Sequence, residues 1–295
     1  MSDDDYCIAV AVGNPDNAEQ LVRTARDIAS ERGGEVFVVG VVVTPRESPF
    51  ALFTDEVIAR EFGGERRAVL DRAVSVAAES DVPVNGKLFV ASSVARGVLH
   101  GVRERDCDAL LLGWEQRTRQ DAVLGSNVDR VVRRADCDVL VEKIGAVAGE
   151  VEAVLLPVAE SRHADFAASV ARAIAVKNDA TVTLLRVVGS EREESAAREL
   201  LAAQADSVSG VDSASGDGSP SDVEVENVVR EGDVADVIVA ASERHDVTVL
   251  GATRSGAIRR RVVGSTPQEV GRRADGTIIL AKRGDGSLAS RVFRL

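Results

Sequence analysis

The sequence predicts an α/β protein made of two tandem domains, each a parallel five-stranded sheet flanked by helices. The chain has 295 residues, about twice the usual size of one domain. Apolar runs alternate with segments of helical periodicity, which is typical of strands buried in a parallel sheet and joined by helices. The order of these elements in the first half recurs in the second half, as expected for a repeat.

The first half begins with an apolar run, Cys7 to Val12, that predicts a buried strand. Gly13 to Asn17 breaks the run before a helical pattern over 21–29, and Glu35 to Val43 is the next expected strand. Two strands separated by a helix indicate a right-handed parallel connection. Pro45 to Phe62 shows no regular pattern. The other expected elements are a helix over 65–80, a strand over 83–90, a helix over 94–105 capped by Ser93, a strand over 109–112, a helix over 127–135 and a strand over 138–142.

The second half retraces this order, with a strand over 153–158, a helix over 163–177 and a strand over 181–188. Asp233-Val234-Ala235 matches Ser93-Val94-Ala95, and the segment 246–251 matches 108–113. Both halves also carry Arg-Arg-Ala-Asp, at 133–136 and 272–275. A duplication is the simplest account. It predicts domains at 1–145 and 151–285, a short linker before residue 151, a mobile loop over 207–222 and a C-terminal tail at 286–295.

The composition argues against several classes of function for this protein. The net charge of −12 argues against general binding to nucleic acid or anionic lipid, since those surfaces repel an acidic protein. The longest strongly apolar stretch, Phe37 to Val43, is far shorter than the roughly 20 residues of a membrane span. The acidic start lacks the basic and apolar pattern of an export signal, so a cytoplasmic location is expected. Scarce lysine with abundant Asp, Ala and Val is typical of a halophile or a GC-rich genome.

The sequence contains no motif for metal binding or for catalysis. Cys7, Cys107 and Cys137 lie far apart and form no C-x-x-C pair, so they are predicted to act as small buried apolar residues. The three histidines, His100, His163 and His245, are isolated and are expected on helix surfaces or at helix ends. No Gly-x-Ser-x-Gly elbow is present. No catalytic residue and no metal ligand is therefore predicted.

The segment 250–275 carries the strongest sign of a binding site. The strand 247–250 ends at Gly251, and after Thr253 and Arg254 a span of nine residues leads to Gly264-Ser265-Thr266, which opens a helix. Glycine lets backbone approach a ligand closely, and the N–H groups of a helix start face an anion. The pattern indicates a phosphate site. The alternative is a strand-to-helix turn that this kind of fold needs whatever it binds.

This glycine pattern resembles the nucleotide loop of the universal stress protein family, Gly-x-x-Gly, nine residues, then Gly-Ser or Gly-Thr. Both halves resemble that family over nearly their whole length. The resemblance implies a Rossmann-like or flavodoxin-like sheet, and in nucleotide-binding members ATP lies at the carboxyl ends of the first, second and fourth strands. Carried onto the second half, it assigns Pro157, Val158, Ala159 and Val187 to the adenine side, and Gly251, Gly264, Ser265 and Thr266 to the phosphates. Leu250 and Arg254 complete the candidate nucleotide site.

Departures from the family pattern differ between the halves. Ala159 and Gly13 stand where ATP-binding members carry a base-reading aspartate, and Arg254 replaces the second loop glycine. Arg254 either fills the phosphate site or binds a phosphate through two N–H groups. The first loop, with Gly113, Trp114, Gly125 and Ser126, is one residue shorter and carries Glu115, which repels phosphate. We interpret Trp114 as a plug rather than a platform for a base.

The resemblance implies a non-enzymatic tandem regulatory protein that binds ATP or another adenine nucleotide weakly in its second domain. One alternative is a cytosolic regulatory domain related to those appended to membrane transporters. Another is a slow ATP hydrolase, although no acidic pair or lysine sits beside the glycines. The expected partners are an unidentified protein and the chain's own other half, since pairing 139–142 with 277–281 would give a pseudo-dimer that covers two sheet edges. Further homodimerisation is an option, and membrane insertion is not expected.

Overall fold

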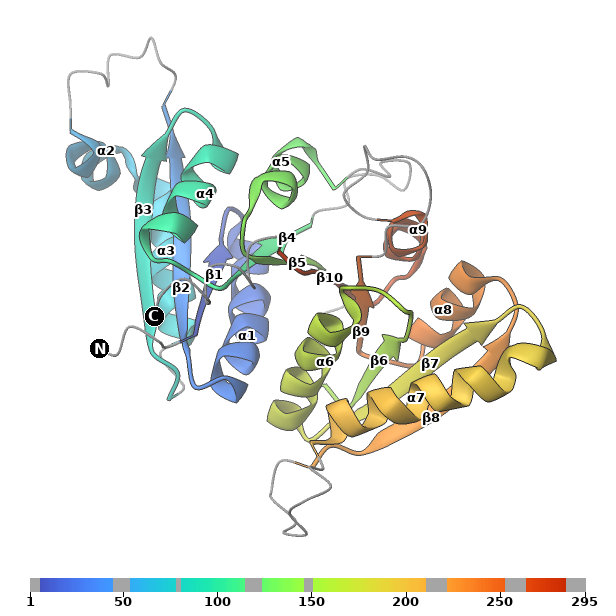
Figure 1. Cartoon of the computed structure of the whole chain (residues 1–295). Helices are drawn as coiled ribbons and strands as arrows, with labels where there is room; N and C mark the ends of the chain where they lie inside the picture. Colours follow the sequence, from blue (N-terminus) through green and yellow to red (C-terminus); the bar gives the residue numbers. More distant parts are fainter. Residues whose placement is uncertain are drawn as a thin grey trace, which may run out of the picture. The chain divides into compact units, whose positions relative to one another are not determined.

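A computed structural model describes residues 6–44, 54–77, 81–114, 124–145, 151–210, 222–252 and 264–284. The chain divides into two compact units, drawn in Figure 1. The division falls after Val141, and Gly284 belongs to the first unit. Most of the predicted linker, Ile144 to Glu150, and the tail 286–295 lie outside the described residues, as does most of the loop predicted over 207–222. The loop begins later than predicted, because residues 207–209 belong to the helix Glu194–Ser209. No helix in the described ranges is both long enough and apolar enough to cross a membrane.

In the first unit the strands follow the order β3-β2-β1-β4-β5. The pairings β1 with β2, β1 with β4 and β2 with β3 are parallel. Helices α1 and α3 pack together, as do α4 and α5, and the two pairs cover the sheet (Figure 1). The elements are β1 (Cys7–Ala11), α1 (Pro15–Glu31), β2 (Glu35–Val43), α2 (Asp55–Phe62), α3 (Gly64–Ala77), β3 (Val84–Ala91), α4 (Val94–Glu104), β4 (Ala109–Gly113), α5 (Ser126–Arg134) and β5 (Asp138–Lys143).

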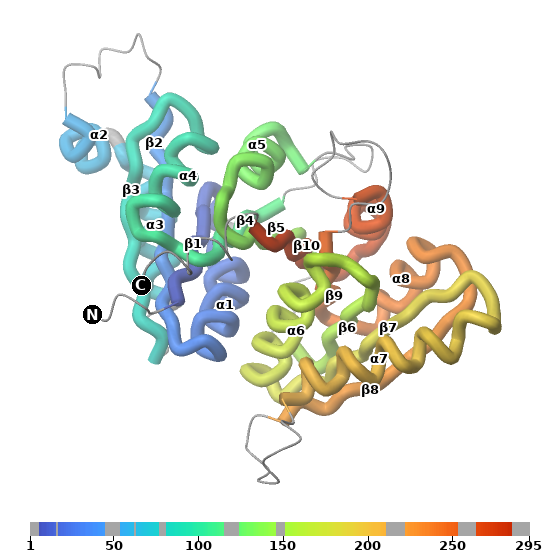
Figure 2. Tube along the Cα trace, viewed as in Figure 1, coloured from blue at the N-terminus to red at the C-terminus, as the bar shows by residue number. Residues whose placement is uncertain are grey.

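The second unit repeats this arrangement, with strand order β8-β7-β6-β9-β10 and parallel pairing of β6 with β7 and β9, of β7 with β8 and of β9 with β10. The predicted fold class, a tandem pair of parallel α/β sheets, is confirmed, and Figure 2 traces the repeat. The elements are β6 (Ala153–Pro157), α6 (Ala164–Asn178), β7 (Thr181–Val188), a short 3-10 turn (Glu191–Glu193), α7 (Glu194–Ser209), β8 (Val225–Glu231), α8 (Val234–Ser242), β9 (Val247–Gly251), α9 (Ser265–Arg273) and β10 (Thr277–Lys282).

Polar side chains fix the repeated elements at matching points. Ser93 and Asp233 cap α4 and α8, as predicted. Their side-chain oxygens accept hydrogen bonds from Arg96 N at 3.4 Å and from Ala235 N at 3.0 Å. A second matched pair was not predicted. The carboxylate of Asp108 accepts a hydrogen bond from Cys7 N, and that of Asp246 accepts one from Ala153 N, each at 3.0 Å. In each unit this carboxylate ties the fourth strand to the start of the first.

One helix was missed in the sequence. Residues 45–62 were expected to be irregular, yet Asp55–Phe62 forms α2, with the Thr54 hydroxyl accepting a hydrogen bond from Val57 N. A helix of eight residues makes only about two turns, which is too short to establish a 3.6-residue apolar period. The sequence signal that was available was the cap, a threonine followed by Asp55 and Glu56 in the first turn.

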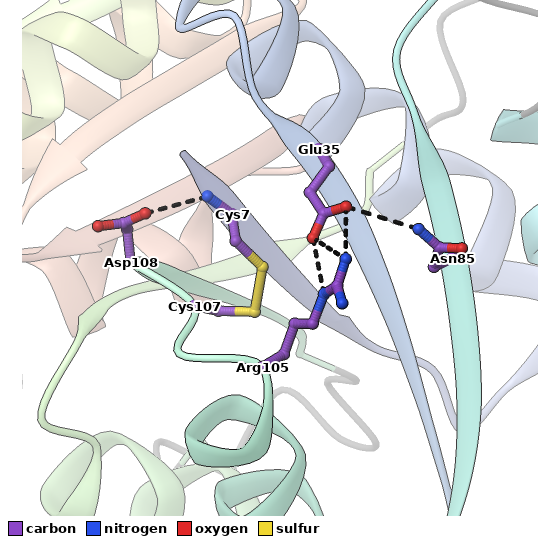
Figure 3. Close-up of a disulfide and its surroundings, with 6 residues drawn as sticks. All are labelled: Cys7, Glu35, Asn85, Arg105, Cys107 and Asp108. Atoms are coloured by element: carbon purple, nitrogen blue, oxygen red, sulfur yellow. Dashed lines mark hydrogen bonds and ion pairs between the residues drawn. A yellow bond between two sulfur atoms is a disulfide. The ribbon is translucent and has the colours of Figure 1, made fainter. Parts of the chain in front are cut away.

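The expectation that the cysteines act only as small buried residues is wrong for two of them. Cys7 and Cys107 form a disulfide with a Cα–Cα distance of 4.6 Å (Figure 3). They meet because β1 and β4 are neighbours, with Ile8 opposite Ala109. Beside the disulfide, Arg105 donates two hydrogen bonds to the Glu35 carboxylate, at 2.8 and 2.9 Å (Figure 3). The sequence separation of 100 between the cysteines hid this pairing from sequence reasoning.

Candidate functional site

The carboxyl ends of three strands bring the predicted site residues of the second unit to one edge of the sheet. Pro157 at the end of β6 lies opposite Leu185 in β7, and β9 runs parallel to β6 on its other side. The N–H of Val158 donates to the carbonyl of Leu185 at 2.8 Å, which holds the chain against the sheet just beyond β6. This edge is where open parallel sheets bind ligands.

The two loop glycines of this edge are not required by the backbone. Gly264 has φ −62° and ψ 166°, an extended conformation that any residue adopts. A Cβ added at Gly251 would lie 3.5 Å from the Cβ of His163, an ordinary van der Waals contact. Neither the backbone angles of Gly264 nor the space around Gly251 therefore requires glycine.

Helix α9 begins directly after Gly264 without a side-chain cap. Its first turn presents the backbone N–H groups of Ser265 and Thr266, while Pro267 has none. The exposed N-terminus of a helix attracts anions through these groups and the helix dipole. Arg254 and the rest of 253–263 lie outside the described residues. At the other end of α9, hydrogen bonds to Asp236 and then Glu269 raise the pKa of Arg273, so this arginine is engaged by carboxylates.

The predicted adenine side carries an arginine that sequence reasoning missed. Nη1 of Arg186, in β7, donates a hydrogen bond to the carbonyl of Val158 at 3.1 Å. Val158 is buried, while Ala159 and Val187 are half-buried. The guanidinium of Arg186 therefore lies beside the position assigned to the base. Its place in the apolar run Leu184 to Val188 gave no sign of this role.

The structural role of His163 was also missed in the sequence. It stands at the start of α6, as expected for a helix-end residue, but only 3 % of it is exposed. Its Nδ1 accepts a hydrogen bond from the backbone N–H of Arg283 at 3.0 Å, so in the neutral ring the proton is on Nε2. The imidazole thus joins the start of α6 to the end of β10, next to Gly251.

The equivalent edge of the first unit is built differently. Trp114 follows β4 and is 4 % exposed, and its indole N–H is buried with no hydrogen-bond partner among the described residues. Gly125 has φ +80°, which L side chains rarely adopt, so here the backbone itself requires glycine. The guanidinium of Arg66 donates to the carbonyl of Gly13 at the end of β1. Ser126 opens α5, and residues 115–123 lie outside the described part.

Nothing in the described residues supplies a metal centre, since no group of three His, Cys, Asp or Glu side chains gathers within them. The second-unit edge therefore combines the N–H groups at the start of α9, the Arg186 guanidinium, the half-buried Gly251 and the buried Gly264. Such N–H groups and guanidiniums attract anions.

Several known proteins are similar to the chain, among them the following three. A universal stress protein from Archaeoglobus fulgidus has a TM-score of 0.66 and 18% identity, covering 95% of this chain and 97% of that one. The cytoplasmic domain of a prokaryotic cation chloride cotransporter has a TM-score of 0.59 and 13% identity, covering 99% and 100%. The Na(+)/H(+) antiporter NhaS5 of Synechocystis sp. is 24% identical over 185 residues, 62% of this chain. That match spans only 26% of the antiporter's length.

A family model describes the repeat directly. The model of the universal stress protein family matches residues 7–143 and, a second time, residues 150–282. The two matches cover nearly all of the strands and helices in both units. The chain therefore belongs to the universal stress protein family.

Proposed function

We propose that the protein is a non-enzymatic regulatory module that binds ATP or another adenine nucleotide weakly in its second unit. The observation that carries this proposal is that neither Gly251 nor Gly264 is required by the backbone. Both stand at the ligand edge of the sheet, and α9 starts there without a side-chain cap. In the first unit the buried Trp114 stands at the start of the matching loop, so on this proposal the equivalent edge of that unit binds no nucleotide.

Affinity is limited on the adenine side. Ala159 offers no side-chain acceptor to the base, and the Val158 carbonyl already accepts from Arg186. The loss of one hydrogen bond from a buried base costs about 1–3 kcal/mol, or roughly tenfold to a hundredfold in Kd. Ala159→Asp is expected to recover this and to tighten ATP binding by about tenfold or more in titration calorimetry.

Gly13→Asp is the matched control, because it adds the same carboxylate at the end of the equivalent strand. It should leave ATP binding unchanged, since Arg66 lies beside Gly13 and would pair with the new carboxylate. A gain at Gly13 equal to the gain at Ala159, or no gain at Ala159, would contradict the proposed base position. Release of ADP with repeated turnover in the same samples would instead establish a hydrolase.

We also propose that the halves associate through their last strands, with an unidentified protein as the partner of the assembled chain. The strands β5 and β10 support this, because each is short and buried along its whole length. Separately expressed halves, 1–145 and 151–285, are expected to form a heterodimer in analytical ultracentrifugation. Halves that fold but stay monomeric at high micromolar concentration would argue against the pseudo-dimer.

A second candidate function is regulation of a membrane transporter. The match to the antiporter NhaS5 favours it, and the cotransporter cytoplasmic domain shares the tandem fold over the whole chain. On this proposal the chain binds the cytosolic side of an ion transporter. Crosslinking in cells of the source organism should then recover an ion transporter with the chain, and recovery of other proteins alone would count against this candidate.

A further inference from the structure

A pocket lies within the first unit, and all of its lining residues come from that unit. It has a volume of about 420 Å³ and lies along α4 and α5, which Figure 2 shows side by side. Arg96 and Arg103 come from α4, and Arg130 and Arg134 come from α5. Ser93 and Leu99 complete the lining. Four guanidiniums in one pocket are unexpected in a chain whose net charge is −12.

The carboxylates of these two helices are engaged elsewhere. Glu104, the one acidic residue of α4, pairs with Lys87 at 2.5 Å. Asp129, the one acidic residue of α5, pairs with Arg133 at 2.9 Å. Within the described residues, no carboxylate is paired with any of the four pocket arginines. The pocket lining therefore carries a net positive charge.

The second unit shows that the fold does not require this arrangement. Alignment of the caps Ser93 and Asp233 places Asp236 opposite Arg96 and Glu243 opposite Arg103. Alignment of Gly125 with Gly264 places Glu269 opposite Arg130 and Arg273 opposite Arg134. There the remaining arginine, Arg273, is paired with Asp236 at 2.6 Å and with Glu269 at 3.1 Å. In the second unit, acidic side chains thus balance the charge of the arginine at this place, whereas in the first unit they do not.

We propose that this arginine pocket binds a small anion that carries two or more phosphate groups. Each guanidinium presents a planar fork of N–H donors that matches phosphate oxygens, and several are needed to balance a multiply charged ligand. Ser93 lies at the start of α4, so the positive end of that helix dipole adds to the field. A pocket of this volume accepts a ligand of nucleotide or polyphosphate size.

The test uses inorganic tripolyphosphate as the probe and a charge exchange taken from the second unit. In Arg96→Asp/Arg130→Glu, Arg134 gains the two partners that Arg273 has, so the variant should fold with an unchanged or raised thermal midpoint. Calorimetry of the intact chain at physiological salt should show saturable binding by the parent. The variant should bind at least about a hundredfold more weakly, because two forks are lost and two carboxylates oppose the anion.

Arg192→Asp/Arg244→Glu is the control, since it makes the same change in net charge at two exposed arginines of the second unit. It should keep tripolyphosphate affinity within about threefold, because neither arginine lines the pocket and exposed charges are strongly screened at physiological salt. Equal loss in both variants would overturn the site and leave only general charge attraction. Citrate binding as strong as tripolyphosphate binding would overturn the assignment to phosphate.

Discussion

Phe166→Ala is expected to lower the unfolding free energy of the second unit by about 3–5 kcal/mol, the usual cost of removing a buried aromatic ring. Phe166 lies on α6 and is 0 % exposed. Helix α6 packs against β6, β7, β9, β10 and α7, so the ring is enclosed by elements that cannot easily collapse into the space it leaves. Urea unfolding followed by far-ultraviolet circular dichroism measures the loss.

Lys177→Ala on the same helix is the control for this substitution. Lys177 is exposed, and its removal should change the unfolding free energy by only about 0.5 kcal/mol or less. A cost below about 1 kcal/mol for Phe166→Ala would be inconsistent with a packed core at this position. The same result would argue against α6 as the packed helix that positions His163.

Reduction of the Cys7–Cys107 disulfide is expected to destabilise the first unit by about 2–5 kcal/mol, because the bond closes a loop of 100 residues. The single tryptophan of the chain, Trp114, is buried in the same unit, so its fluorescence reports on that unit. Its urea midpoint should fall when a phosphine reductant is added. Cys107→Ala should have the lower midpoint already and should not respond to the reductant.

Thiol counting gives an independent check on the disulfide. Of the three cysteines, only Cys137 should react with iodoacetamide in the urea-denatured protein before reduction, and all three should react after it. Three reactive thiols without reductant would contradict the disulfide. Cys137→Ser serves as the control, since it should keep the response of the urea midpoint to reductant.

Much of the fold could be predicted from the sequence because its signals are local. The run Thr181 to Val188 was predicted as a strand and is β7 with the same bounds. Ser93 and Asp233 were recognised as caps because a cap needs only its own helix start. The duplication was visible because matched segments, such as 108–113 and 246–251, have nearly the same pattern.

The missed features depend on contacts between distant segments. The sequence placed Cys7 and Cys107 far apart, and only the neighbouring positions of β1 and β4 join them. Arg186 contacts Val158 through strand pairing, and His163 meets Arg283 across 120 residues. The arginine pocket likewise needs α4 to pack on α5. Such contacts have no signature in a local pattern.

The location of nucleotide binding is tested most directly by matched substitutions at the first residues of α9 and α5. Ser265→Asp and Ser126→Asp each place one carboxylate at an exposed helix start. Calorimetry with ATP is best done in the Arg96→Asp/Arg130→Glu background, so that the arginine pocket contributes no heat. The serines are better test positions than the neighbouring glycines, because Gly125 has φ +80° and any side chain there would strain the backbone.

In that background we expect ATP to bind with a stoichiometry of about one per chain, as the proposal of a single site in the second unit requires. Ser265→Asp should abolish the binding heat, because its carboxylate repels phosphate at the start of α9. Ser126→Asp should leave the Kd unchanged. Binding that survives Ser265→Asp, or equal losses in the two variants, would contradict a nucleotide site confined to the second unit.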